Sequence, residues 1–295
     1  MGYTGSHGYN ELLSVDQNLP SAHYPYPTQA VTLTSTGLAN PALWNTTSWV
    51  SQGISFYNGL EVDVNQRLSH GLQFRGAYTF SKSLDDGDSM NTSVATNSPA
   101  FASNPLNLRA DYGRASFDIR HSAVINATYE LPFGRGKGSN EWVNRFIADW
   151  QISGIETVQS GLPFTPQLSY NPSNDGDTRN PVRPSWNPSF SGPVILGGPS
   201  RYFNPNAFIQ PAAGTYGNVG RNVLQGAGIS QTDFSLTKKI LLTERFNLQF
   251  RSEFFNIFNH ANFNNPVGEF LAPTFGLVTS AQSPRIGQLA VKFIF

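Results

Sequence analysis

Apolar and polar residues alternate with a period of two over long stretches of this chain, and this pattern limits the fold more than any other feature. In GLQFRGAYTFS (71–81), every second residue from Leu72 to Phe80 is apolar or glycine, and the residues between them are polar or small. Successive side chains of a β-strand point to opposite faces, so such a segment predicts a strand with one apolar face. Comparable alternation occurs in 59–69, 119–131, 150–164, 233–241, 246–256 and 287–295, and a partial strand is predicted around 3–13. A sustained helical period is nearly absent, so we predict an all-β fold with about eight long strands.

The length and polarity of these segments favour a membrane protein. Most contain ten or more residues, whereas strands of soluble proteins usually have about five or six and a tilted transmembrane strand needs about 9 to 11. The polar face mixes Gln, Asn, Ser, Thr and single charges of both signs, which suits the lumen of a barrel better than a solvated sheet. We therefore predict an antiparallel transmembrane β-barrel segment, with the solvated sheet of a soluble β-sandwich as the alternative.

The lengths of the connections alternate along the chain. Long connections are predicted at about 15–53, 85–116, 165–228 and 259–285, and shorter ones at 69–71, 133–146 and 241–245. Outer-membrane barrels have short periplasmic turns and long extracellular loops, and structureless loops this long are uncommon in compact soluble domains. The alternation also predicts that the last strand runs toward the periplasm. Phe295 then lies at the periplasmic rim, where aromatic residues are enriched.

Composition narrows the range of functions. The chain has no cysteine, which excludes disulfides and zinc thiolate sites. Its formal net charge is zero, which gives no electrostatic attraction to nucleic acid. The five histidines lack metal-ligand spacing, and no G-x-S-x-G motif occurs. We expect no catalytic residue, no metal, no cofactor and no enzyme activity. No run of about 18 apolar residues and no signal peptide is present, so we expect any export signal to lie upstream.

Two short motifs have a simpler interpretation than the one they first suggest. DDGDSMN (85–91) is an acidic loop without the spaced glycine and the distal glutamate of an EF-hand, so it predicts a polar turn, with a weak surface calcium site as the alternative. GRGKGS (134–139) has Leu131 where a phosphate-binding loop needs its first glycine. It is therefore predicted to be a basic periplasmic turn.

Six segments together resemble a known family. They are YTFSKSLDDG (78–87), FDIRH (117–121), YELPFGRGKG (129–138), WQISGIETVQSGLPFTP (150–166), EFFNIFNHANF (253–263) and FGLVTSAQSPRIGQLAVKFIF (275–295). In this order they resemble the C-terminal barrel region of TonB-dependent outer-membrane receptors. The closest resemblance is to the Oar-like subgroup of acidobacteria and related bacteria, whose members often carry a carboxypeptidase-regulatory-like domain. Residues 1–50 and 170–228 match loosely, as expected of extracellular loops.

The resemblance implies a 22-stranded barrel, closed by an N-terminal plug that contacts TonB, in the outer membrane of a Gram-negative cell. Residues 1–295 would then be the C-terminal part of the barrel, without the plug and the N-terminal domain. The whole receptor would take up a large, scarce ligand of the siderophore, oligosaccharide or peptide class. The implied partners are outer-membrane lipid, the barrel-assembly machinery and, through the missing plug region only, the TonB complex. The family's terminal aromatic is its assembly signal, and Phe295 matches it, with Phe293 and Val291 as alternating companions.

Aromatic residues in the long loops are candidates for contacts with this ligand. They are Trp44, Trp49, Trp186 and Tyr202, and packing of the loops against each other is the favoured alternative for them. Eight strands cut from a larger sheet leave two open edges that lipid cannot satisfy, so we expect the isolated fragment not to transport. Two other functions remain open: a self-contained eight-stranded adhesin or anchor barrel, and a soluble carbohydrate-binding β-sandwich.

Overall fold

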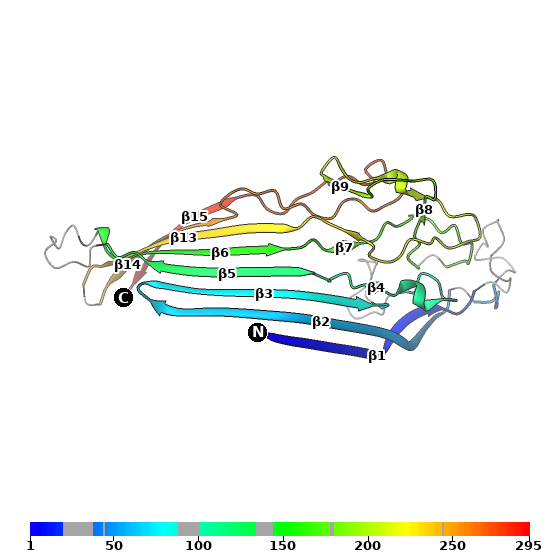
Figure 1. Cartoon of the computed structure of the whole chain (residues 1–295), viewed down its shortest axis with the longest axis horizontal. Helices are drawn as coiled ribbons and strands as arrows, with labels where there is room; N and C mark the ends of the chain where they lie inside the picture. Colours follow the sequence, from blue (N-terminus) through cyan, green and yellow to red (C-terminus); the bar gives the residue numbers. More distant parts are fainter. Residues whose placement is uncertain are drawn as a thin grey trace.

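Eight long strands form one antiparallel sheet in chain order. The computed structural model describes residues 1–19, 38–43, 45–87, 101–133, 144, 146–177, 180–243 and 245–295. The long strands are β1 (Gly2–Asp16), β2 (Thr47–Ser69), β3 (Leu72–Asp85), β5 (His121–Glu130), β6 (Trp150–Gln159), β13 (Ile229–Leu241), β14 (Asn247–Phe255) and β15 (Ile286–Ile294). Each pairs with its neighbours in sequence order, which confirms the prediction of about eight antiparallel strands (Figure 1).

The other elements are short and lie mostly in the connections. The short strands are β4 (Gly113–Arg114), β7 (Pro163–Phe164), β8 (Ser185–Trp186), β9 (Ile195–Gly198), β10 (Arg201–Phe203), β11 (Phe208–Ile209) and β12 (Leu224–Gln225). Two 3-10 turns are η1 (Leu108–Asp111) and η2 (Pro205–Ala207). In the described part of the chain, no helix has the length and apolar character needed to span a membrane.

The long and the short connections gather at opposite ends of the sheet (Figure 1). At the turn end, β2 and β3 are joined through His70 and Gly71, which have φ angles of 50° and 82°. Two successive positive φ values match the twist of a tight hairpin, which explains the glycine at this position. We call the opposite side the loop end.

Two predicted boundaries differ from the structure. The loop predicted for 15–53 is shorter, because β2 already begins at Thr47. The strand predicted for 150–164 ends at Gln159, and Phe164 instead pairs with Leu224 of β12. A Cβ at Gly161 would lie 1.9 Å from the carbonyl oxygen of Gly226, so a glycine is needed for the two backbones to approach this closely just after β6. The period-two pattern of the sequence continues past Gln159, which is why the sequence predicted a strand up to Phe164.

The strand register separates an apolar face from a polar face. Leu72, Tyr129, Ile152 and Leu236 lie side by side on the apolar face. Arg75 and Asp63 form a 3.1 Å ion pair on the polar face. Aromatic residues of the apolar face lie near both ends of the strands, with a row of Phe74, Phe234 and Phe254 between them. Those near the ends include Tyr78, Phe80 and His121 toward the loop end, and Tyr129, Trp150 and Phe293 toward the turn end.

The spacing of these aromatic groups fits a bilayer. The Phe80–His121 pair and the Leu72–Tyr129 pair belong to the same two strands and are eight residues apart. At about 3.3 Å per residue, they are separated by about 26 Å along the strand. The outward apolar band of an outer-membrane barrel is about 25 Å tall and bordered by aromatic girdles. The apolar face therefore has the dimensions of a lipid-facing surface.

The sheet is open at both sides. Its strand order begins with β1 and finishes with β15, and no pairing joins these two strands. The eight long strands also belong to one sheet rather than to two sheets packed face to face, so the soluble sandwich is not the observed fold.

Candidate functional site

The loop-end connections pack into a structured unit, which we call the cap and define as residues 101–118, 160–177, 180–228 and 256–285 (Figure 1). Its centre is a hydrophobic core of Phe164, Tyr202, Phe203, Ala207, Phe208, Val219, Leu224 and Phe275. Phe203 is fully buried, and its ring centroid lies 4.8 Å from that of Phe275 and 5.8 Å from that of Phe208. The described parts of the predicted connections 85–116, 165–228 and 259–285 therefore form a packed unit rather than structureless loops.

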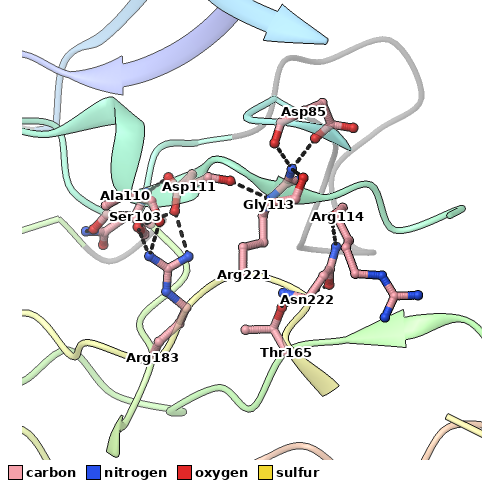
Figure 2. Close-up of polar contacts among 11 residues, drawn as sticks. Asp85, Ser103, Ala110, Asp111, Gly113, Arg114, Thr165, Arg183, Arg221 and Asn222 are labelled. Atoms are coloured by element: carbon pink, nitrogen blue, oxygen red, sulfur yellow. Dashed lines mark hydrogen bonds and ion pairs between the residues drawn. The ribbon is translucent and has the colours of Figure 1, made fainter. Parts of the chain in front are cut away.

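A buried ion pair joins two separate connections of the cap (Figure 2). Arg183 Nη1 donates to Asp111 Oδ1 at 2.7 Å. Arg183 Nη2 donates to Ser103 Oγ at 2.9 Å and to the carbonyl oxygen of Ala110 at 3.1 Å. Both charged side chains are at most 5% exposed. Because the two charges are desolvated together, loss of either one leaves the other uncompensated.

A second buried arginine connects the cap to the sheet. Arg221 Nη2 contacts both the carboxylate and the backbone carbonyl of Asp85 at the end of β3, and Arg221 Nε donates to the carbonyl oxygen of Asp111 at 2.7 Å (Figure 2). Burial lowers the pKa of the Arg221 guanidinium, and the Asp85 carboxylate acts in the opposite direction. The next residue, Asp86, accepts a hydrogen bond from the Ile54 backbone, and burial raises the pKa of its carboxyl.

A third set of polar contacts fixes the connection before β5. Arg114 Nε donates to Asp118 Oδ2 at 2.8 Å, and Asp118 Oδ1 accepts from the Ser83 backbone at 2.7 Å. Asn222 Nδ2 donates to the carbonyl oxygen of Arg114, while its backbone N–H donates to Thr165 Oγ1, each at 2.8 Å. Asn222 has a φ of 52°, a conformation that asparagine adopts more readily than most residues. The cap is thus hydrogen-bonded to β3 at several points.

The segment 171–177 folds around its own side chains. Asn171 Nδ2 donates to Asp175 Oδ1 at 2.7 Å, and Asp175 Oδ2 accepts from the Tyr216 hydroxyl at 2.9 Å. Asn180 Nδ2 bridges Asp175 Oδ2 and the carbonyl oxygen of Ser103. Among the residues that the structure describes, no group of three or more His, Cys, Asp or Glu could hold a metal ion.

A small polar pocket lies where these networks meet. It has a volume of about 200 Å³. Its lining residues are Ser103, Asn104, Asn107, Ala110, Pro181, Val182, Arg183, Tyr216 and Gly217. The Nε atom of Arg183 is buried and has no hydrogen-bond partner in the described structure. The polar side chains of the lining, among them Ser103, Asn104 and Tyr216, suit a small polar ligand group chemically.

The predicted loop aromatics lie elsewhere. Tyr202 is 7% exposed in the core of the cap, and the ring of Trp186 stacks on Phe208 at 5.0 Å. Trp49 is exposed, but it belongs to strand β2 rather than to a loop. Trp44 lies outside the described residues. Trp49, Trp186 and Tyr202 are not among the residues that line the polar pocket, and ligand contact by the four loop aromatics stays a prediction.

The other predicted positions are distributed over both ends of the sheet. Val291, Phe293 and Phe295 are exposed, and the Phe293 ring stacks on Phe246 at 5.5 Å. Their role as an assembly signal stays a prediction. Asp85 and Asp86 of the acidic segment are buried, whereas residues 88–91 and the basic segment 134–139 lie outside the described residues.

Sequence reasoning missed the polar network of the cap. Asp111, Arg183 and Arg221 occur in connections without periodicity, and no motif marks them. The partners are also far apart in the chain, since Arg221 and Asp85 are separated by 136 positions. The only available signal was the presence of isolated charges inside long loops rich in Gly, Pro and Asn.

Comparison with known proteins gave one informative result. A family model described as an outer membrane beta barrel domain matches residues 1–288. No curated protein matches this chain. The family match extends from β1 into β15 and includes the whole cap.

Proposed function

Because the chain belongs to the outer membrane β-barrel domain family and so lies in the outer membrane, we propose that it is the C-terminal barrel portion of a TonB-dependent, Oar-like receptor. In this proposal, residues 1–295 supply the barrel wall, the extracellular cap and the assembly signal. The plug, the contact with TonB and the Gram-negative origin come from the resemblance described above. The transported ligand is large and scarce, of the siderophore, oligosaccharide or peptide class, and the chain itself catalyses no reaction.

The observation that carries this proposal is the open sheet. Apart from a bridge between Ser14 and Phe101, the outer edges of β1 and β15 pair with none of the strands that the structure describes. Lipid cannot satisfy the backbone N–H and C=O groups of such edges, so only closed barrels cross a membrane as sheets. The self-contained eight-stranded barrel would need β15 to pair with β1, and this pairing is not observed. Further strands are therefore needed, which supports a larger barrel.

The packed cap supports capture of a ligand from outside the cell. Binding residues are commonly placed on loops that a rigid scaffold positions. Here the hydrophobic core and the Arg183–Asp111 and Arg221–Asp85 ion pairs hold the loops in one arrangement. The polar pocket beside Arg183 offers donors and acceptors for a polar ligand.

Uptake measured in whole cells tests the transport proposal. A strain without the gene and a complemented strain would receive a labelled ferric siderophore, a labelled maltooligosaccharide and a labelled peptide, with and without a protonophore. We expect the deletion to abolish uptake of one class, and the protonophore to have the same effect in the complemented strain. Equal uptake of all three classes by both strains would contradict transport.

The adhesin or anchor alternative makes a different prediction. An eight-stranded barrel that closes on itself would refold alone in detergent and show heat-modifiable migration at the mass of one 295-residue chain. We expect this chain alone to aggregate instead, because most of both sheet edges pairs with no strand that the structure describes. A stable, heat-modifiable monomer of this chain would favour the alternative.

A further inference from the structure

The polar pocket of the cap is built where two connections meet. One wall comes from 103–110, between β3 and β4, and the other comes from 181–183 and 216–217, between β6 and β13. Arg183 reaches from the second wall to Ser103 and Ala110 of the first (Figure 2). A Cβ at Gly217 would lie 1.9 Å from the carbonyl oxygen of Arg183, so a glycine is needed for the close approach of these two segments. The walls are therefore held together by direct contacts.

The size of the pocket suits one unit of a larger ligand. Its volume is about 200 Å³, whereas pockets that enclose a whole drug-sized ligand usually measure about 300–1,000 Å³. A compact ligand such as a ferric siderophore exceeds this space. A polymeric ligand can place a single unit in the pocket and extend the rest of its chain outside.

The lining presents no net charge to a ligand. Among the described residues of the lining, Arg183 alone carries a charge. Its Nη1 lies 2.7 Å from Asp111 Oδ1 in a pair of side chains that are at most 5% exposed. Ser103 Oγ accepts from Arg183 and donates to Asp111, so this hydroxyl belongs to the same pair. An anionic ligand group would find its counter-charge already neutralised, and a cationic group would lie beside Arg183, so a neutral group fits best.

Two carboxamides offer hydrogen bonds to such a group. Asn104 and Asn107 belong to one turn, in which the Asn107 N–H donates to the Asn104 carbonyl oxygen at 2.9 Å. Asn107 is exposed at the start of η1, and its side chain makes no capping hydrogen bond there. A carboxamide both donates and accepts, and so does each hydroxyl group of a sugar. The two asparagines can therefore pair with sugar hydroxyl groups in either direction.

The rest of the lining is largely apolar. Ala110, Pro181, Val182 and Gly217 contribute apolar groups, and the hydroxyl of Tyr216 donates to Asp175 Oδ2 at 2.9 Å. A sugar ring carries hydroxyl groups at its edge and C–H groups on its faces, so it matches a pocket with both kinds of surface. A peptide unit offers only one donor and one acceptor on its backbone, which matches the two carboxamides less well.

We propose that this pocket binds one neutral sugar unit of an oligosaccharide. The inference rests on the proposed function, because it takes the cap as the part of the receptor that meets the ligand outside the cell. Asn107 contacts the sugar hydroxyl groups directly, with Asn104 beside it. The transported ligand is then an oligosaccharide rather than a siderophore or a peptide.

Binding to the full-length protein tests the site without transport. Protein extracted from outer membranes in a mild detergent would be applied to an array of neutral oligosaccharides that includes maltohexaose, cellohexaose and xylohexaose. Oligogalacturonides, ferric enterobactin and a mixture of random peptides provide the comparison. The pocket variant is Asn107→Leu, which nearly keeps the size of the side chain and removes its hydrogen-bonding groups. The matched control is Asn206→Leu, because Asn206 is also an exposed asparagine of a 3-10 turn, η2, and does not line the pocket.

We expect the wild type and Asn206→Leu to bind a neutral oligosaccharide with dissociation constants within about threefold of each other. Asn107→Leu should bind it about tenfold more weakly or worse, because sugar hydroxyl groups lose their partners. Unchanged thermolysin cleavage of the cap confirms that each variant is folded, and Asn107→Ala replaces Asn107→Leu if cleavage is faster.

Binding of only the acidic oligosaccharides, the siderophore or the peptides would overturn the proposal, and so would equal affinity of the pocket variant. Failure of the transport proposal is a separate result. A protein that binds a neutral oligosaccharide through Asn107 but does not take it up retains this site and contradicts transport alone.

Discussion

Replacement of Phe203 by alanine should open the cap while leaving the sheet folded. The Phe203 side chain is fully buried, and the centroids of three other phenylalanine rings lie 4.8–5.8 Å from the centroid of its own ring. A Phe→Ala change at such a position costs about 3–5 kcal/mol, because apolar contacts are lost and a cavity remains. All three neighbouring rings belong to the cap, so the cost falls on local opening of the cap rather than on the strand pairing.

Thermolysin cleavage within the cap measures this opening. When opening and closing are fast relative to cleavage, the cleavage rate follows the population of the open form. A cost of about 3–5 kcal/mol then raises the rate by about 100-fold or more, since about 1.4 kcal/mol corresponds to a factor of ten. Heat-modifiable migration of the full-length protein extracted from outer membranes should stay unchanged, because it reports the sheet.

Phe258→Ala is the matched control. Phe258 lies in the same cap but is 76% exposed, so its replacement should change the cleavage rate by less than about threefold. The reasoning fails if Phe203→Ala raises cleavage less than tenfold. It also fails if Phe203→Ala abolishes heat-modifiable migration, because cap and sheet would then unfold as one unit.

Three further changes test other parts of the structure. Asp111→Ala leaves the buried Arg183 charge uncompensated and should destabilise the cap by about 3–5 kcal/mol, seen as faster thermolysin cleavage, while Asp111→Asn should cost less. Burial raises the pKa of the Asp86 carboxyl in the folded protein above its unfolded value. The stability that the protonated carboxyl contributes is present below the unfolded pKa and is lost as the pH rises through the folded pKa. The stability of Asp86→Asn relative to the wild type should therefore rise with pH in thermolysin cleavage assays from pH 4 to 7. Phe295→Ser should lower the amount of barrel in the outer membrane, measured on gels of membrane fractions, whereas Leu241→Ser, another exposed apolar residue at the turn end, should not.

The sheet could be predicted from the sequence because the pattern that identifies each strand lies within that strand. Side chains on a strand alternate between faces, so the pattern from Leu72 to Phe80 reports one strand without reference to any other. Two strands that a short turn such as His70–Gly71 joins then pair with each other, because the turn leaves little choice. The same local rule failed at Phe164, where an apolar residue of the right parity belongs to the cap core and not to the sheet.

The cap could not be predicted because contacts between residues far apart in the sequence hold it together. Arg183 meets Asp111 across 72 positions, and no spacing rule connects two such residues. Tyr202 and Trp186 illustrate the same limit, since the sequence favoured packing for these loop aromatics but could not name the residues against which they pack. Only the three-dimensional arrangement places Tyr202 in the core and Trp186 against Phe208.

The long sequence separation of the cap contacts has a consequence for the order of folding. Strands that are joined by the short turns close small loops when they pair, which costs little chain entropy and proceeds quickly. Arg221 can meet Asp85 only after the 136 positions that separate them have been synthesised and exported. We therefore expect the hairpins to assemble first and the cap to close last. During that interval the cap segments are exposed to periplasmic or surface proteases, so a chain with a slow-closing cap would be degraded before it reached its final form.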